Sequence, residues 1–432
     1  MKRIFAFLFA GSSLLAQVSA PDLLRDAAKR TPIGLEEFQR LAIANSPTLQ
    51  EANAIVKASA ARANQAGLYP NPSIGYQGEQ IRGGMFGGGE QGAFVGQTFV
   101  LGGKLGLRRN VYEQQRRTDE IGVSEERYRI LSDTGQAFYF ALAVQEIVNV
   151  RRRLLILATD AVETAHQLAN VGQADASDVL QAEVEAEQAN VDYTVAQRDY
   201  IQAFHSLAAL VGKPELTISP LQGDLAHPPA INADQIMYQV LRDSPSVKRA
   251  QQDVVRAEAE IKSAKRETVP DLQVHAGLQQ NLEALNELSG KSVGLQAFVT
   301  AGIQLPIFDR NQGNVAAAEA DLERARAQIN NSQLSLRRTI EPLLQAYLSS
   351  HIEADRYRGE MIPRAQRAYE LYLAKYEEMA AAYPQVLVSQ RMLFQLQVDY
   401  IHALERVWRT AIILQNFGLS SGTLTQDFGL TH

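Results

Sequence analysis

The chain has 432 residues, with 42 Lys and Arg against 48 Asp and Glu, and it contains no cysteine. The net charge of −6 does not favour nucleic-acid binding, which requires a basic surface. The lack of cysteine excludes disulfides, thiol catalysis, thiolate metal sites and a lipid anchor on a mature N-terminal cysteine.

Residues 1–20 have the pattern of a secretory signal peptide. Lys2 and Arg3 precede an apolar stretch over 4–15, and small residues at 18–20 form a cleavage site. The apolar stretch is too short to span a bilayer, and the rest of the chain has no apolar run of about 18 residues. We therefore expect an exported chain without a transmembrane helix; the alternative is a buried N-terminal helix.

The mature chain contains two copies of one unit. From Ala182 to Leu210, small and apolar residues recur in steps of four and three, the spacing of a helix packed along one seam. A seam with the same steps runs from Ser389 to Phe417, 207 residues later. This duplication favours one pseudo-symmetric body over two or three unrelated domains.

Each copy is expected to hold a short helix, a strand hairpin, a very long helix and a heptad helix. The first copy covers 21–212 and the second 234–418, joined by a linker at 213–233 and followed by a tail at 419–432. The predicted elements of the first copy are a hairpin at 72–102, a long helix at 104–171 and a heptad helix at 177–211. Those of the second copy are a hairpin at 270–307, a long helix at 312–379 and a heptad helix at 385–418.

The hairpin of the second copy alternates between apolar and polar residues. Leu272, Val274, Leu295, Val299 and Ile303 fall on one face. The opposite face carries the candidate lumen residues Gln273, Gln279, Gln296 and Gln304. Strands of about ten residues with one apolar and one polar face suit an outer-membrane barrel, with lipid outside and water inside. The alternative is a hairpin of a soluble sandwich.

The long helices are too long for a compact domain. The first has no proline, and about 67 helical residues extend roughly 100 Å, which favours a coiled-coil assembly. The second contains Pro342 and Pro363 and is expected to bend. Gly135 matches Pro342 at the offset of 207, which predicts a shared kink at one height.

The sequence offers no catalytic, cofactor or metal site. It has no G-x-S-x-G, P-loop or H-E-x-x-H motif, and the seven histidines are scattered. We interpret the carboxylates of Glu183, Glu185 and Glu187 and the run 151–153 of arginines as solvated helix faces. Trp408 is interpreted as a core residue. An enzyme is therefore not expected.

The number of strands bears on assembly. Four strands cannot close a barrel, because the smallest closed ones have about eight. Two chains would give eight strands and an interior filled by side chains, whereas three would give twelve strands and leave a lumen. We expect a homotrimer, with four or more chains as the weaker alternative.

The order of elements, repeated twice, resembles the TolC family of outer-membrane efflux ducts over nearly the whole mature chain. Local matches are Leu68-Tyr69-Pro70-Asn71-Pro72 before the first strand and Val100-Leu101-Gly102-Gly103-Lys104 after the hairpin. Gly172 with Asp178-Val179-Leu180 matches at the helix turn. The Pro-Asn-Pro and Leu-Gly-Gly-Lys motifs look most like the CzcC-type subgroup of heavy-metal resistance systems.

This resemblance implies a mainly α fold with a β-barrel contribution. Three chains would form a twelve-stranded barrel in outer-membrane lipid, continued by a twelve-helix barrel across the periplasm. The implied partners are a periplasmic adaptor and an inner-membrane pump of the RND type, which supplies the energy, so the duct needs no cofactor. Some family members close with acidic residues just after the second turn. Gln385 and Val388 stand there in this chain and, with Asp178 of the first copy, are the candidates for the periplasmic gate.

The turns between long and heptad helices are expected to be the periplasmic mouth that meets the adaptor. Gly172 suits a helix end because glycine tolerates positive φ, and Asp175 or Ser177 is placed to cap the next helix. The second turn has no glycine, so the two tips are expected to differ in shape. The predicted contact residues are Val171, Gly172, Gln173, Ala174, Asp175, Ala380, Ala381, Ala382 and Tyr383.

Two other classes of protein compete with a passive efflux duct. A stand-alone porin would need many more strands per chain than four. A periplasmic coiled coil without a pore would not need hairpins of alternating polarity. The sequence does not name the exported compound, since metal cations and drugs are both compatible with a duct that leaves selection to the pump.

Overall fold

The computed structural model describes residues 24, 27, 29–81, 88–172, 174–284, 292–378 and 383–422. The expected signal peptide and most of the expected tail lie outside these residues. The chain divides into two compact units. We call 47–127 with 237–339 the strand unit, and 1–46 with 128–236 and 340–432 the helix unit.

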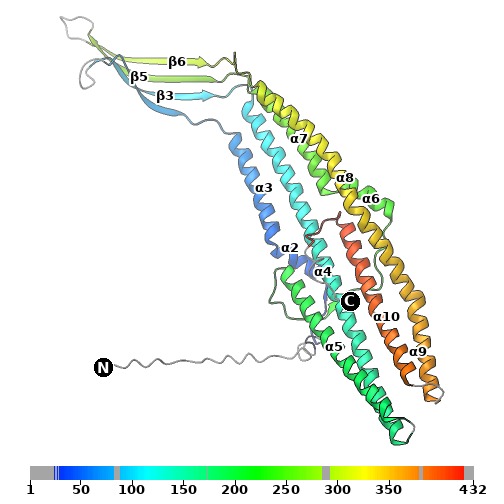
Figure 1. The fold of residues 1–432 in the computed structure, drawn as a ribbon. Coiled ribbons are helices and arrows are strands. Elements are labelled where there is room, and N and C mark those ends of the chain that lie inside the picture. The colour runs from blue at the N-terminus through cyan, green and yellow to red at the C-terminus, as the bar shows by residue number, and fades with distance from the viewer. Residues whose placement is uncertain are drawn as a thin grey trace, which may run out of the picture. The chain divides into compact units, whose positions relative to one another are not determined.

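The strand unit contains one four-stranded antiparallel sheet (Figure 1). Its strands are β2 (Ser73–Glu79), β3 (Glu90–Phe99), β5 (Leu272–Ala284) and β6 (Ser292–Ile303), in the order β2-β3-β5-β6. The two predicted hairpins are therefore joined, because β3 pairs with β5 across about 180 residues of sequence, Phe99 lying opposite Leu272. Within the described residues, β2 and β6 each have one neighbour in the sheet, so the described sheet is open at both edges.

Besides the sheet, the strand unit contains helices that bury small residues. They are α3 (Pro47–Ala66), α7 (Pro245–Arg266) and the first parts of α4 (Lys104–Asn170) and α8 (Gln312–Arg356). Their buried positions include Ala63, Ala250, Ala257 and Ala259. Small side chains at these positions allow helix backbones to approach closely. Polar groups also join them, since Gln252 Nε2 donates to Gln114 Oε1 at 3.0 Å.

The helix unit has a larger apolar core. It contains α2 (Leu35–Asn45), α5 (Ala176–Leu210), α9 (Ile362–Glu377), α10 (Tyr383–Gln415) and the later parts of α4 and α8, while the short α6 (Ala233–Asp243) lies at the boundary between units. Phe38 packs on Phe138 and Phe204, with ring centroids 5.9 and 6.2 Å away, and all three rings are fully buried. In Figure 1, α5 runs beside the later part of α4, and α9 runs beside α10.

The linker between the repeats is held by side chains of the helix unit. Strand β4 (Leu221–Gln222) pairs in parallel with β1 (Ile33–Gly34). Gln145 binds both backbone groups of Leu221, and the Tyr200 hydroxyl donates to Ser219 O at 2.9 Å. Trp408 Nε1 donates to Leu225 O and its ring stacks on Tyr139 at 3.8 Å. Trp408 is thus a structural residue, as the sequence predicts.

The second long helix, expected at 312–379 with bends at its two prolines, is interrupted near the second of them. A π-helical turn, Tyr357–Met361, separates α8 from α9, and Pro363 is the second residue of α9. The ring of Pro363 has no N–H and would clash with the carbonyl four residues earlier, so an additional residue in the preceding turn relieves the conflict. Pro342 lies inside α8 without interrupting it. The shared bend at Gly135 and Pro342 stays a prediction.

Two further local findings concern the helices. Ser244 occupies the N-cap position of α7, but its hydroxyl pairs with Ser246 Oγ at 2.8 Å and makes no cap bond to the helix backbone. Among the described residues, none of the helices combines the length and the apolar character that crossing a bilayer requires.

Candidate functional site

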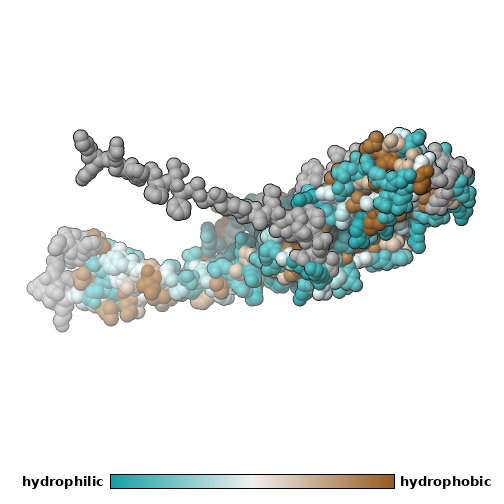
Figure 2. Space-filling model, turned by 90° about the horizontal axis from the view of Figure 1, so that it is seen from below, coloured by the Kyte–Doolittle hydropathy of each residue, from teal (hydrophilic) through white to brown (hydrophobic). Residues whose placement is uncertain are grey.

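One face of the sheet exposes large apolar side chains. Leu295 is 71% exposed and Val299 72%, while Ile303 and Leu278 are more than half exposed. Leu272 and Val274, predicted for the same face, are half-buried. Figure 2 shows hydrophobic residues at the surface over the strands. Nothing among the described residues covers this face, which is unusual for a face in water.

The opposite face of the sheet is polar and partly linked by hydrogen bonds. Gln279 lies directly opposite Gln296 in the ladder. Glu90 accepts hydrogen bonds from Gln279 and, at 2.8 Å, from Asn281 Nδ2. The structure therefore brings together two of the four predicted lumen glutamines.

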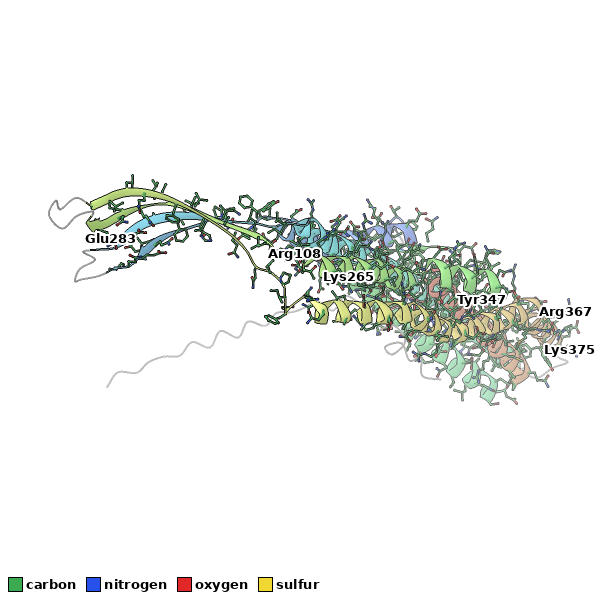
Figure 3. The ribbon with its side chains drawn as sticks, turned by 90° about the horizontal axis from the view of Figure 1, so that it is seen from above. Arg108, Lys265, Glu283, Tyr347, Arg367 and Lys375 are labelled. Atoms are coloured by element: carbon green, nitrogen blue, oxygen red, sulfur yellow. The ribbon has the colours of Figure 1, made fainter. Side chains whose placement is uncertain are left out.

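The other two lumen glutamines lie nearer the helices. Gln273 is on the same face, opposite Gly302, and is exposed. Gln304 follows the last residue of β6 and is also exposed. In Figure 3, Glu283 marks the far end of the strands, whereas Arg108 and Lys265 lie where the helices begin.

A buried lysine fixes the junction between the sheet and α4. Lys104 Nζ lies 2.7 Å from Asp271 Oδ1 and donates to Val269 O at 2.9 Å, and the lysine is only 3% exposed. The Leu101 N–H donates to the same Asp271 oxygen at 3.0 Å. Gly102, at φ +72°, permits this close approach because a Cβ there would lie 3.0 Å from the Val269 side chain. The Leu-Gly-Gly-Lys motif thus holds the start of α4 against the residues that precede β5.

The first tip has the turn that the sequence predicts. Helix α4 ends at Asn170, Val171 is exposed, and Gly172 has a φ of +73° with open space around its Cα. Asp175 is the N-cap residue of α5, but its side chain makes no cap hydrogen bond; its carbonyl accepts from the Asp178 N–H at 3.0 Å. Ala174 is half-buried.

The second tip requires a correction. Tyr383, predicted as a surface contact, is 5% exposed and packs with Val179, Ala182 and Leu387. Burial raises the pKa of Tyr383 to about 12, and its hydroxyl has no hydrogen-bond partner among the described residues. The Tyr383 ring packs on the apolar side of α5, and this contact joins the second tip to the first. The predicted contact residues Gln173, Ala380, Ala381 and Ala382 lie outside the described residues.

The gate candidates lie near the start of their helices. Val388 is 66% exposed and Gln385 is exposed on α10, while Asp178 is half-buried in the first turn of α5. The sequence prediction named these three residues as a gate, and they remain candidates.

An ion pair close to these residues was missed. Glu185 of α5, interpreted from the sequence as solvated, has a side chain only 6% exposed, and it accepts a hydrogen bond from Arg391 Nε of α10 at 2.8 Å. The hydrogen bond with Glu185 raises the pKa of Arg391. A signal was present in the sequence, because these opposite charges are 206 residues apart, close to the repeat offset of 207.

The candidate site consists of the two faces of the sheet and the two helix tips. Among the described residues, no group of three or more His, Asp or Glu side chains is arranged to hold a metal ion. What the structure does present is a sheet with one exposed apolar face and one polar face, and a helix unit whose two tips are tied together.

The model of the family described as "Outer membrane efflux protein" matches residues 39–213 and 236–416. The two matched segments follow the two repeats and cover most of the chain. The chain belongs to the outer membrane efflux protein family. It is accordingly an outer-membrane protein of efflux, and the predicted family and location are confirmed.

The curated relatives include metal resistance proteins and also outer-membrane proteins of toluene and antibiotic efflux pumps. The chain is 26% identical over 391 residues to the cobalt-zinc-cadmium resistance protein CzcC of Cupriavidus metallidurans, covering 90% of each chain. It is 26% identical to the nickel-cobalt-cadmium resistance protein NccC of Alcaligenes xylosoxydans xylosoxydans, covering 72% of this chain and 70% of that protein.

Solved channel structures share the fold. A crystal structure of CusC superposes with a TM-score of 0.71 at 16% identity, covering 94% of this chain and 95% of CusC. VceC of Vibrio cholerae superposes with a TM-score of 0.67 at 18% identity, covering 93% and 99%. The efflux family member therefore has the mainly helical fold of TolC-like outer-membrane channels.

Proposed function

We propose that three copies of this chain form a passive duct that carries substrates from an inner-membrane pump and a periplasmic adaptor to the outside. The observation that carries the proposal is the open four-stranded sheet, apolar and exposed on one face and polar on the other. Unpaired edge strands in lipid are costly, because no water is available to bond their backbone groups. Closure with the edges of further copies removes this cost.

A second stripe on α5 supports association of copies. Leu180, Val184, Val191 and Val195 are 62%, 68%, 48% and 53% exposed. They lie on the side of the helix opposite the buried seam that contains Ala182 and Ala189. A helix that is apolar on two opposite faces requires a second partner. A neighbouring copy supplies that partner in a twelve-helix barrel, below a twelve-stranded barrel in the membrane.

The faces of the sheet provide the sharpest test. Arginine at a lipid-facing position in mid-strand is expected to cost about 2–4 kcal/mol, and much less on the lumen face. We expect Val299→Arg to abolish outer-membrane assembly, whereas the matched variant Gln296→Arg assembles. Native mass spectrometry in mild detergent reports trimers directly. Equal assembly defects, or a stable monomer or dimer in the parent, would contradict the proposal.

The tips are the proposed contact with the adaptor. Gly172 has open space at its Cβ position but a φ of +73°, so a bulky residue there meets no packed neighbour and strains only the backbone of the turn. We expect Gly172→Trp to abolish export in cells while trimer level and membrane insertion stay normal, and a cysteine at 172 to crosslink to the adaptor. The sequence prediction makes Ala381→Trp its counterpart. Full export by both variants, without crosslinks, places the partner elsewhere.

The substrate class is proposed from the relatives. Heavy-metal cations are the first candidates, because the names of CzcC and NccC refer to cobalt, zinc, cadmium and nickel resistance. A deletion strain challenged with these metals and, in parallel, with drugs decides between metal and drug export. A stand-alone porin would take up solutes without the pump and adaptor, and a non-pore coiled coil would form no conducting trimer.

A further inference from the structure

A single ladder row on the polar face alternates glycine and phenylalanine across all four strands. Gly75 pairs with Phe94, Phe94 with Gly277, and Gly277 with Phe298. The row towards the strand tips contains Gln77, Gly92, Gln279 and Gln296, and the row towards the helices contains Ser73, Gly96, His275 and Thr300. An aromatic row thus lies between two mainly polar rows.

Each ring of this row lies over a neighbouring glycine. A Cβ added to Gly75 would stand 2.6 Å from Cε1 and Cζ of Phe94, and its three nearest atoms all belong to that ring. A Cβ on Gly277 would meet the Ala93 carbonyl oxygen first and would stand 2.6 Å from Cζ of Phe298. Side chains on a strand normally stand roughly perpendicular to the sheet. These two rings instead lean along the sheet into the space that the missing side chains leave.

We propose that the row of Gly75, Phe94, Gly277 and Phe298 is a bore-setting belt of the duct, in which the glycines keep the rings flat against the wall. The inference rests on the proposed duct, since it takes the polar face as the lumen. Two phenylalanines per chain give six in three copies, as one ring of three Phe94 and a second ring of three Phe298 at a different height, because barrel strands are tilted. Erect phenylalanine rings would narrow the passage, whereas flat ones leave it open to bulky or hydrated substrates.

The absence of native cysteine makes an accessibility test clean. Thr98 lies on the same face and nearer the helices than the belt, so a reagent from outside the cell must pass the rings to reach it. In Thr98→Cys cells, we compare the labelling rate of a small maleimide with that of the same group on a polyethylene glycol close in width to the lumen. Taking the ratio of the two rates cancels differences between variants in the number of trimers per cell.

The belt predicts a size-selective effect. Gly75→Ala is expected to slow the polymer severalfold and the small maleimide little, because the new methyl group displaces the Phe94 ring into the lumen. Gly75→Ala with Phe94→Ala is expected to restore at least the parental ratio, because no ring of residue 94 then stands in the lumen. Gly302→Ala is the matched control, since it lies on the same face with nothing within 4 Å of its Cβ.

The outcomes separate the belt from the duct. If the small maleimide never reaches residue 98 from outside, the lumen assignment and the proposed function fail together. If it does, and Gly75→Ala and Gly302→Ala give equal ratios, the belt is overturned and the rings serve only to cover glycines. Should Gly75→Ala fail to assemble, the Phe94→Ala and Phe298→Ala double variant keeps both glycines. It is expected to admit the polymer faster than the parent, and an equal rate overturns the belt.

Discussion

The two repeats begin their long helices in different ways. In the first repeat, Lys104 Nζ donates to Val269 O at 2.9 Å, and in the second, Asn311 Nδ2 donates to Ala264 O at 2.8 Å. The two donors are 207 residues apart, at the same place in the repeat, and both acceptors lie at or just after the end of α7. Both copies of the duplicated unit therefore place a side-chain nitrogen donor at the start of the long helix.

The chemistry around the two donors differs. The first junction turns through Gly102 and Gly103, at φ +72° and +71°, and buries its lysine beside Asp271. The second junction reaches positive φ only at Asn311, at +59°, which asparagine tolerates better than most residues. Removing the partner of a buried charge lowers the free energy of unfolding more than removing the partner of a neutral amide. Equivalent places in the two repeats are therefore expected to contribute unequally to stability.

The largest effect is expected from removal of the lysine. Lys104→Met leaves the Asp271 carboxylate with the Leu101 N–H as its remaining close donor, and we expect a loss of about 2–3 kcal/mol, reduced from the fully buried case because Asp271 is 30% exposed. Asn311→Gly keeps the backbone conformation and removes two neutral hydrogen bonds, one to Ala264 O and an exposed one from Asn314 Nδ2, for about 1 kcal/mol. Thermal unfolding of the purified trimer measures both, and equal losses would remove the asymmetry between junctions.

The next effect concerns the ion pair that joins the repeats through α5 and α10. Arg391→Met leaves the Glu185 carboxylate buried without its partner, and we expect a loss of about 2 kcal/mol. Glu185→Gln leaves Arg391, which is 60% exposed, free to be solvated, and we expect about 1 kcal/mol or less. The same unfolding assay compares them. A larger loss for Glu185→Gln would show that the arginine is the more desolvated partner.

A smaller effect is expected at low pH, where the first junction should lose part of its contribution to stability. Burial by itself acts to raise the pKa of Asp271, but the Lys104 ammonium and the Leu101 N–H outweigh it and hold the pKa below its ordinary 3.8. Because the folded pKa is the lower one, the stabilisation is full above the unfolded pKa and is lost as pH falls through the folded value. Unfolding scans from neutral pH down to about pH 3 should show this loss in full in the parent and in Asn311→Gly, and a smaller loss in Lys104→Met, which keeps the Leu101 N–H. Equal acid loss in all three proteins would place the titrating group elsewhere.

The smallest effect is expected at the predicted shared bend. Pro342→Ala restores an N–H donor inside α8, and Gly135→Ala raises helix propensity but places a Cβ 3.1 Å from Cγ2 of Ile412. We expect both stability changes to stay within about 1 kcal/mol. Spin labels on either side of each position measure the bend, which should decrease in Pro342→Ala and persist in Gly135→Ala. Straight helices in the parent at both positions would end the idea.

The sequence by itself determined the features that repeat over short distances. The heptad steps placed Ala182, Ala189 and Leu207 in a buried seam, and the alternation separated Val299 from Gln296. Glycine at 172 marked a turn because positive φ is a property of the single residue. Periodicity and backbone preference are local, so one sequence suffices to recognise them.

Only the tertiary structure decided which distant residues meet. The pairing of β3 with β5 depends on a register between strands about 180 residues apart, and a shift by one residue would turn every side chain to the other face. The same reason applies to Glu185, solvated by its local pattern but buried against Arg391, and to Tyr383, which the first tip covers. Burial depends on what packs against a face, and a helical or strand period states only that the face exists.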